Sequence, residues 1–312
     1  MRNRTWIVSL VLCFYTSILF SQDVPFQYEG IMAVVELDSL VVEALADGFN
    51  TEEFIEIVKE DTSFYTAFHN LRKHAFKAEH FLNFQDKKGR NQANFEAKTE
   101  QIKVDSCREM IWREQSATGD FFRNNDTYRY WTAEIYARVF FLSQAYCPVE
   151  TSQEPPEKPK GLDRYYQELK KFIFQPGEQV QVPLVSKRTA LFSEHLRPYY
   201  DYRIEVDTFD NIPCYTFTIQ TKAKYQESQK SKTVLKFMKT YFQKDNLQVL
   251  YRKYSFQLQG LASCDVEMEV QLKKVANEYF PQIVQYKGEW NIPGKRRERG
   301  TFRTTLSSFK LD

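Results

Sequence analysis

Apolar and polar residues alternate along most of the C-terminal half of this 312-residue chain. The pattern is most regular from Cys264 to Leu272, where every second residue is apolar and the residues between are acidic or amide side chains. Because successive side chains of a β-strand point to opposite faces, this pattern predicts a strand with one buried face. It excludes an amphipathic helix, which needs apolar residues three or four positions apart.

The same alternation recurs in several segments with short polar turns between them. These segments are Tyr202 to Val206, Tyr215 to Ile219, Leu235 to Tyr241, Leu247 to Tyr251, Cys264 to Leu272, Ile283 to Tyr286 and Phe302 to Leu306. Because no helical pattern lies between these strands, they predict an antiparallel meander.

The N-terminal half shows helical periodicity instead. Three short helices are predicted between Asp38 and Phe76, and Asn50 and Glu53 have capping-box spacing at the start of the second. A hairpin follows over Ala75 to Trp112. Its second half, Asn94 to Trp112, fits an edge strand or an exposed helix, and the strand is favoured; a helix over Tyr128 to Phe141 comes next. The chain is therefore predicted to be α+β, with a curved C-terminal antiparallel meander covered by helices from the N-terminal half.

The first twenty-two residues have the order of a secretory signal peptide. Arg2 and Arg4 precede an apolar run from Trp6 to Phe20, and Ser21 and Gln22 give it a polar end. The run is shorter than the ~20 residues that cross a bilayer, so cleavage near Ser21 or Gln22 is predicted. We expect a protein exported to the periplasm or the extracellular space, with no transmembrane segment after cleavage.

These signals divide the chain into four parts. They are a signal peptide at 1–22, a helical region with a β-hairpin at 23–147, a proline-rich exposed loop at 148–161, and a helix plus the meander at 162–312. Residues 23–312 are expected to form one composite domain.

The net charge of the chain limits the classes of partner that it can bind. The net charge of +2 comes from Arg2 and Arg4, because the other basic residues only equal the 41 acidic ones. A near-neutral chain lacks the positive field that binds nucleic acid, so no nucleic-acid partner is predicted.

The sequence contains no motif for a metal, a cofactor or a catalytic triad. His69 and His74 are five residues apart, which does not place two metal ligands on one helical face. Ser193 and His195 are two residues apart, which is poor geometry for a nucleophile and its base. No catalytic residue, metal ligand or cofactor is therefore predicted, and a non-enzymatic role is favoured over an enzymatic one.

Acidic side chains at Asp265, Glu267 and Glu269 share one strand face. Such carboxylates normally face water and pair with basic residues on the next strand, here Arg252 or Lys253. We therefore expect a solvated charge ladder on this face.

Four cysteines follow the predicted signal peptide: Cys107, Cys147, Cys214 and Cys264. An exported protein can form disulfides, and the wide spacing of these cysteines is not that of a zinc site. Two alternatives stay open: one disulfide, or buried free thiols. If one disulfide forms, we predict Cys214 with Cys264, since both start strands of the same meander.

Large apolar residues occupy parts of both faces of the predicted strands, more than one layer of helices needs to bury. A curved sheet closed by helices can leave an apolar cavity. In this layout, Tyr202 to Leu311 with the hairpin of Ala75 to Trp112 resembles the periplasmic lipoprotein-carrier superfamily. The resemblance implies a half-barrel sheet whose helical lid shields acyl chains.

We therefore predict a non-enzymatic cell-envelope protein that binds an apolar ligand, a lipid or acyl chain, or an envelope partner protein. The ligand is expected on the concave side of the meander, in contact with Leu235, Phe237, Val249 and Tyr251. Two alternatives stay open. One is a structural or assembly protein with a fully packed core and no ligand, and the other is a hydrolase with an unrecognised acidic site.

Overall fold

The computed structural model describes residues 50–105, 107–124, 126–142, 144–147, 173–174, 176–177, 179, 186–226, 232–259, 263–292 and 294–311. The chain divides into two units, Met1–Leu37 and Asp38–Asp312, and every described residue belongs to the second. The predicted signal peptide, the first predicted helix, the proline-rich loop and most of the helix predicted after it lie outside the described residues.

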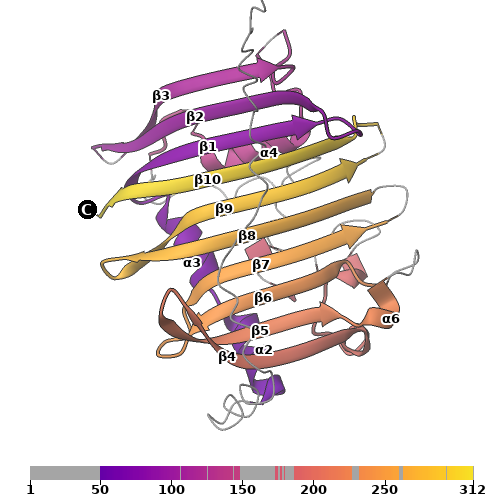
Figure 1. Cartoon of the computed structure of the whole chain (residues 1–312). Coiled ribbons are helices and arrows are strands. Elements are labelled where there is room, and N and C mark those ends of the chain that lie inside the picture. Colours follow the sequence, from indigo (N-terminus) through magenta and orange to yellow (C-terminus); the bar gives the residue numbers. More distant parts are fainter. Residues whose placement is uncertain are drawn as a thin grey trace, which may run out of the picture. The chain divides into compact units, whose positions relative to one another are not determined.

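Ten antiparallel strands form one curved, open sheet (Figure 1). Their order is β3-β2-β1-β10-β9-β8-β7-β6-β5-β4, so β3 and β4 are the edges. The strands are β1 (Ala75–Gln85), β2 (Asn91–Val104), β3 (Cys107–Gly119), β4 (Tyr200–Phe209), β5 (Ile212–Thr221), β6 (Leu235–Gln243), β7 (Val249–Leu258), β8 (Ser263–Val275), β9 (Glu278–Asn291) and β10 (Glu298–Lys310). The predicted meander, β4 to β10, is confirmed, and β1 pairs with β10 to add the N-terminal strands to it.

The predicted edge strand from Asn94 to Trp112 is divided between two strands. β2 ends at Val104, Asp105 has a φ of 54°, and β3 begins at Cys107. Asp tolerates this left-handed conformation better than most residues, which allows a tight reversal here. The edge of the sheet is therefore β3, and β2 is paired on both sides.

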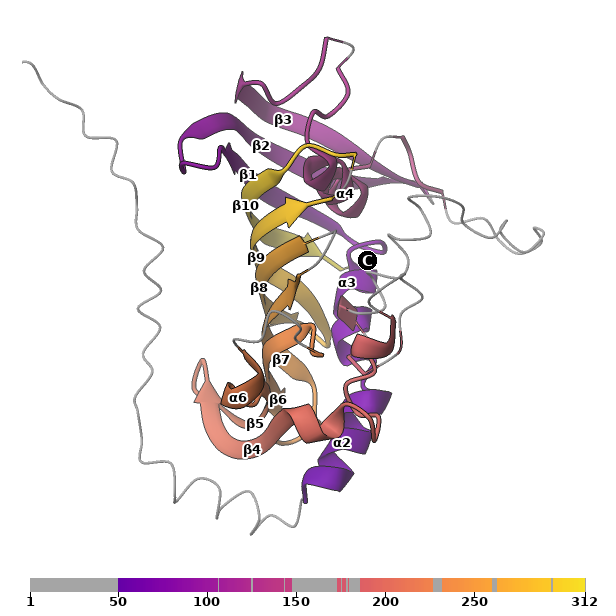
Figure 2. The ribbon, with the colours of Figure 1, turned by 90° about the vertical axis from the view of Figure 1, so that its right-hand side faces the viewer.

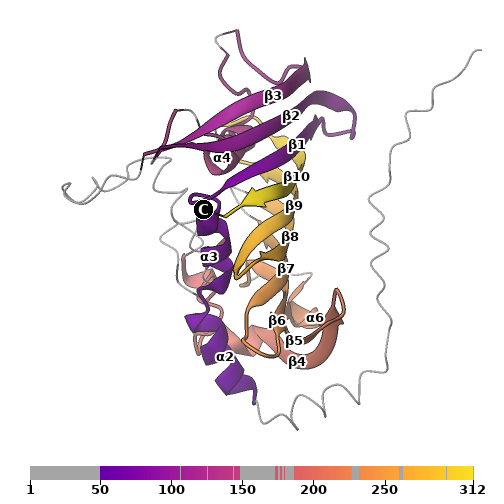
Figure 3. The ribbon, with the colours of Figure 1, turned by 90° about the vertical axis from the view of Figure 1, so that its left-hand side faces the viewer.

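In the part of the chain that the structure describes, three longer helices cover one face of the sheet, which we call the inner face (Figures 2 and 3). They are α2 (Thr51–Glu60), α3 (Ser63–Asn70) and α4 (Trp131–Phe140); η1 (Ser186–Arg188), η2 (Arg197–Tyr199) and α6 (Ala223–Gln226) are short. The predicted capping box of α2 is confirmed, because Asn50 Oδ1 accepts a hydrogen bond of 2.9 Å from the backbone N–H of Glu53. This cap fixes where α2 begins.

Aromatic rings fill the space between the helices and the inner face. Phe54 of α2 stacks on Phe217 of β5, with 5.5 Å between ring centroids. Tyr136 of α4 lies 5.3 Å from Phe302 of β10. Large aromatic rings bury much apolar surface, so these contacts stabilise the packing of the helices on the sheet.

The opposite, outer face carries cross-strand ion pairs. Lys98 lies 2.8 Å from Glu114, and Arg113 lies 2.7 Å from Glu100. The predicted pairing of Lys253 with Glu269 is confirmed at 2.7 Å. The predicted role of Arg252 on this ladder is wrong, because Arg252 points to the inner face and is fully buried.

The predicted Cys214–Cys264 disulfide is also wrong. Both thiols are buried and free, and burial raises their pKa to about 11 and about 12 respectively. They belong to β5 and β8, which are separated by β6 and β7. Three strand spacings are about 14 Å, well beyond the roughly 7 Å that a disulfide can bridge between Cα atoms. Cys107 and Cys147 form the disulfide instead.

Candidate ligand-binding site

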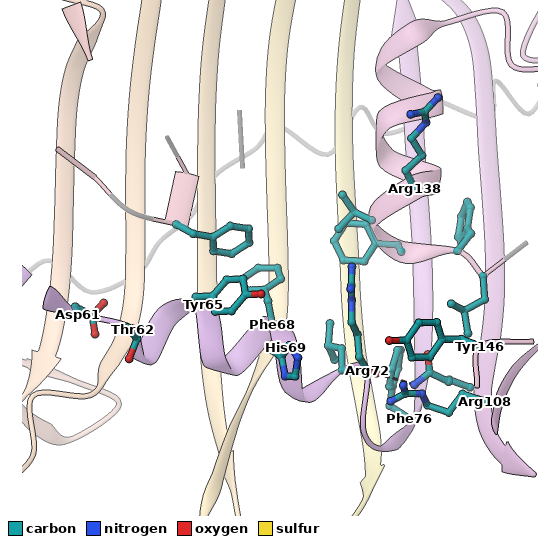
Figure 4. A pocket seen from close by; sticks show the side chains of 17 residues that line it. Asp61, Thr62, Tyr65, Phe68, His69, Arg72, Phe76, Arg108, Arg138 and Tyr146 are labelled. Carbon is teal, nitrogen blue, oxygen red and sulfur yellow. Dashed lines mark hydrogen bonds between the residues drawn. The ribbon is translucent and has the colours of Figure 1, made fainter. Parts of the chain in front are cut away.

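A cavity of about 620 Å³ lies on the inner face, between α3, α4 and strands β1 to β3 (Figure 4). Small-molecule sites in proteins typically occupy about 300–1,000 Å³, so this space is large enough for a ligand. The side chains around it are Asp61, Thr62, Tyr65, Phe68, His69, Leu71, Arg72, Phe76, Gln101, Arg108, Arg138, Val139, Phe140, Phe141, Leu142, Tyr146 and Phe174.

The α3 wall of the cavity is held by the opposite side of the same helix. Phe64, Ala67 and Asn70 are buried, and Asn70 Nδ2 donates a hydrogen bond of 3.1 Å to the carbonyl of Tyr279. Beyond the helix, Gln101 Nε2 donates to the carbonyls of Leu71 and His74, at 2.7 Å each. The bond to Leu71 satisfies a carbonyl at the C-terminal end of α3, where intrahelical partners are missing, and the bond to His74 fixes the turn that leads into β1.

The α4 wall begins at a carboxylate from the sheet. Glu298 Oε1 accepts a hydrogen bond of 2.8 Å from the backbone N–H of Trp131, and Oε2 accepts one of 3.1 Å from that of Thr132. An acceptor with negative charge at a helix N-terminus satisfies unpaired N–H groups and interacts favourably with the helix dipole. Burial raises the pKa of Glu298, although the hydrogen bonds from Thr132 and Trp131 oppose that shift.

A second polar contact ties the middle of α4 to the sheet. The hydroxyl of Tyr136 lies 2.7 Å from His80 Nδ1 and also hydrogen-bonds Thr304. His80 Nε2 lies 2.9 Å from Thr99 Oγ1, so both ring nitrogens have partners. Burial lowers the pKa of His80 to about 4, so the imidazole is neutral at pH 7 and holds the helix without a charge.

Aromatic and aliphatic side chains form the largest part of the cavity wall. Phe68 and Phe174 lie 5.0 Å apart, and Phe141 lies 4.7 Å from Trp112 of β3. Of the large apolar side chains that are exposed in the described ranges, three border the cavity: Tyr65 at 52%, Val139 at 43% and Tyr146 at 44%. An apolar surface gathered around a cavity is typical of a binding site.

One end of the cavity is basic. Arg72 and Arg108 both line it, and Arg108 is only 6% exposed, with its guanidinium 5.0 Å from the ring centre of Tyr146 (Figure 4). Burial lowers the pKa of Arg108, and the nearby charge of Arg72 lowers it further. This end of the cavity therefore concentrates positive charge in an apolar setting.

The disulfide fixes this basic end. It joins Cys107 at the start of β3 to Cys147, and the backbones of Arg108 and Tyr146 exchange two hydrogen bonds of 2.8 Å each. A covalent link beside paired backbones restricts the positions of both side chains. Tyr146 is thereby held against Arg108.

At the other end of the cavity lies Asp61, which has its own counter-charge. Arg252 Nη2 lies 3.5 Å from Asp61 Oδ2, with the guanidinium 4.3 Å from the ring centre of Phe64. Arg252 Nε also donates a hydrogen bond of 3.1 Å to Thr240. This buried pair therefore connects the segment between α2 and α3 to β7.

The four residues predicted to bind a ligand do not share one surface, and none of them lines the cavity. Leu235 and Val249 are buried in the core, 2% and 0% exposed. Phe237 and Tyr251 are partly buried on the outer face. Bulges in the pairing of β6 with β7 break the strict alternation on which the prediction depended. The prediction that these four residues share one concave surface is therefore wrong. Contact between a ligand and these residues stays a prediction.

An apolar cavity was predicted, but its position beside α3 and α4 was not. Phe64 and Tyr65 are adjacent in α3, and the structure buries Phe64 and leaves 52% of Tyr65 exposed. Adjacent helical residues point about 100° apart, so Phe64 and Tyr65 cannot both face the sheet. The adjacent positions of Phe64 and Tyr65 in the sequence could therefore have indicated that one of the two rings does not pack on the sheet.

Among the described residues, no group of three or more His, Cys, Asp or Glu side chains is arranged to hold a metal ion. The histidines lie apart: His74 is 2.8 Å from Glu278, His80 is in the network under α4, and His195 is 6.4 Å from the ring of Tyr199. Nor does any helix in the described part of the chain have the length and apolar character to cross a membrane.

No family model matches this chain, and no curated protein matches it. Two solved chains are similar to it. One is the crystal structure of an outer membrane lipoprotein-sorting protein domain from Vibrio parahaemolyticus, with 6% sequence identity, a TM-score of 0.26, and coverage of 83% of this chain and 90% of that one. At so low a TM-score the similarity assigns neither a fold nor a function.

Proposed function

We propose that this chain is an exported, non-enzymatic cell-envelope protein that binds an apolar ligand, a lipid or an acyl chain, in the cavity between α3, α4 and β1 to β3. The observation that carries the proposal is the cavity of about 620 Å³ with Tyr65, Val139 and Tyr146 exposed around it. A structural protein with a fully packed core would bury such apolar side chains against one another instead of exposing them around a cavity.

Export is supported by the disulfide between Cys107 and Cys147. Disulfides persist in oxidising compartments such as the periplasm and are rare in the cytosol. The N-terminal signal peptide at 1–22 stays a prediction.

Displacement of a fluorescent fatty acid from the purified protein tests the proposal. Val139→Trp adds bulk at the cavity wall, and we expect it to weaken binding at least about tenfold, because the ligand and the indole compete for one space. Phe81→Trp is the matched control, since Phe81 is also 43% exposed and lies on the outer face. Absence of binding to the wild type would reject the proposal, as would equal effects of the two variants.

A further inference from the structure

Among the described residues that line the basic end of the cavity, none is acidic. His69, Arg72 and Arg108 lie close enough that the charges of both arginines lower the pKa of His69, after burial and Lys73. In the described part of the chain, no carboxylate forms an ion pair with Arg72 or Arg108. Arg138, at the α4 wall, is different because it pairs with Glu134 at 2.8 Å.

Arg108 is the exceptional member of this group because it is buried. Taking a guanidinium out of water without a counter-charge is unfavourable, and its contact with the Tyr146 ring offsets only part of that penalty. Arg252, which is fully buried, shows the usual solution, since Asp61 lies beside it. A ligand that brings its own negative charge would supply Arg108 with the partner that the described residues do not provide.

We propose that the ligand of this cavity is an amphiphile whose anionic head group, a carboxylate or a phosphate, binds between Arg72 and Arg108, with its apolar chain along Phe68, Phe140 and Phe174. This inference depends on the proposed function and adds the chemical class of the ligand. A guanidinium presents parallel N–H donors that match the oxygens of either head group. Binding an anion there also removes the repulsion between the two arginines.

The arrangement in the cavity fits such a molecule along its length. Arg72 and Arg108 lie at the end near Phe76 and Tyr146, while Tyr65 and Phe68 lie on the wall that leads away from them (Figure 4). The acidic side chain in the cavity wall, Asp61, is at the far end and is paired with Arg252. An anionic head group bound at the arginine end therefore lies far from the carboxylate of Asp61 and is not repelled by it.

The test compares three probes with the same chain and different head groups: oleate, oleyl phosphate and oleyl alcohol. Calorimetric titration of the wild type below the micelle concentration should give each anion a Kd at least about tenfold lower than the alcohol, the range expected for charge-assisted hydrogen bonds. The ratio of Kd values for oleate and oleyl phosphate then identifies which head group is preferred.

Arg72→Gln and Arg108→Gln should each reduce the anion preference at least about fivefold and leave the Kd of the alcohol nearly unchanged. Arg113→Gln is the control, because Arg113 is exposed on the outer face and pairs with Glu100. If Arg108→Gln does not fold, Arg72→Gln decides alone, since Arg72 is exposed and its replacement does not disturb the core.

The results distinguish failure of the head-group inference from failure of the proposed function. Equal affinity of the wild type for alcohol and anions, or an anion preference unchanged in the Arg72 variant, overturns the head-group inference and leaves apolar binding in place. Absence of binding for all three probes overturns the proposed function itself.

Discussion

Glu298 and Thr132, 166 residues apart in the sequence, share two hydrogen bonds at the start of α4. Glu298 Oε2 accepts from the backbone N–H of Thr132 at 3.1 Å and from its hydroxyl at 2.7 Å. The N-cap residue of α4, Tyr130, makes no side-chain capping bond, so the cap comes from the sheet. Because α4 is one wall of the cavity, this contact positions the wall.

Glu298→Ala should lower the free energy of unfolding by about 1–3 kcal/mol, since it leaves buried N–H groups of α4 without an acceptor. Urea unfolding followed by circular dichroism measures the change. Glu298→Gln keeps one acceptor oxygen and should lose less. A stability for Glu298→Ala equal to that of the wild type would show that the sheet does not cap α4.

Glu298 should also make stability depend on pH. Burial raises its pKa in the folded protein, so the folded state holds the proton more tightly than the unfolded chain. The stability that this group contributes is therefore fully present below its ordinary pKa and is lost as the pH rises through the raised folded value. The wild-type unfolding free energy minus that of Glu298→Gln should fall across this window; a flat or rising difference contradicts the assignment.

Much of the fold was predictable because alternation and capping are local patterns. The strand of Cys264 to Leu272 and the helix that begins after Asn50 are both confirmed, since a two-residue period and a capping box specify structure within a few residues. Bulges in the pairing of β6 with β7 were not predictable, because they depend on the partner strand.

The site was less predictable than the fold. Arg252 follows Tyr251 in an alternating segment and was assigned to the solvated face, yet it is fully buried beside Asp61, 191 residues away by sequence number. Cys107 and Cys147 meet only because the segment after α4 returns to β3. Contacts of this kind follow from tertiary packing, which a single sequence does not encode in a local period.

Asp61→Ala should be strongly destabilising, by about 3–5 kcal/mol, because it leaves the buried charge of Arg252 without its carboxylate. Glu100→Gln at the exposed pair with Arg113 is the control and should change stability by only about 0–1 kcal/mol. Denaturant titration of both variants checks the contrast. Equal small effects would mean that Arg252 finds another partner.

Replacing Cys107 and Cys147 together by serine should reduce stability by about 2–4 kcal/mol, since the disulfide restricts a loop with a sequence separation of 40. It should also weaken ligand binding, because Arg108 and Tyr146 lose the link beside them. Peptide mapping without reduction should find Cys107 joined to Cys147 and the thiols of Cys214 and Cys264 unmodified. A Cys214–Cys264 peptide would contradict the structure.

Variants of Leu235 and Phe237 compare the contributions of the inner and outer faces of the sheet to stability and ligand binding. Leu235→Ala should lower the unfolding free energy by about 2–5 kcal/mol because Leu235 is in the core, while Phe237→Ala on the outer face should lower it less. Binding in the cavity predicts that Phe237→Ala binds fatty acid like the wild type, whereas the ligand contact predicted from the sequence at Phe237 predicts weaker binding. Loss of binding without loss of stability would instead place the ligand on the outer face.

The most direct test of the central claim is mass spectrometry of compounds extracted from the natively purified protein, carried out on the wild type, Val139→Trp and Phe81→Trp. The cavity account predicts an acyl-chain compound in near-stoichiometric amount with the wild type and Phe81→Trp, and its loss from Val139→Trp. Its retention in folded Val139→Trp at the wild-type level would contradict binding in the cavity between α3 and α4.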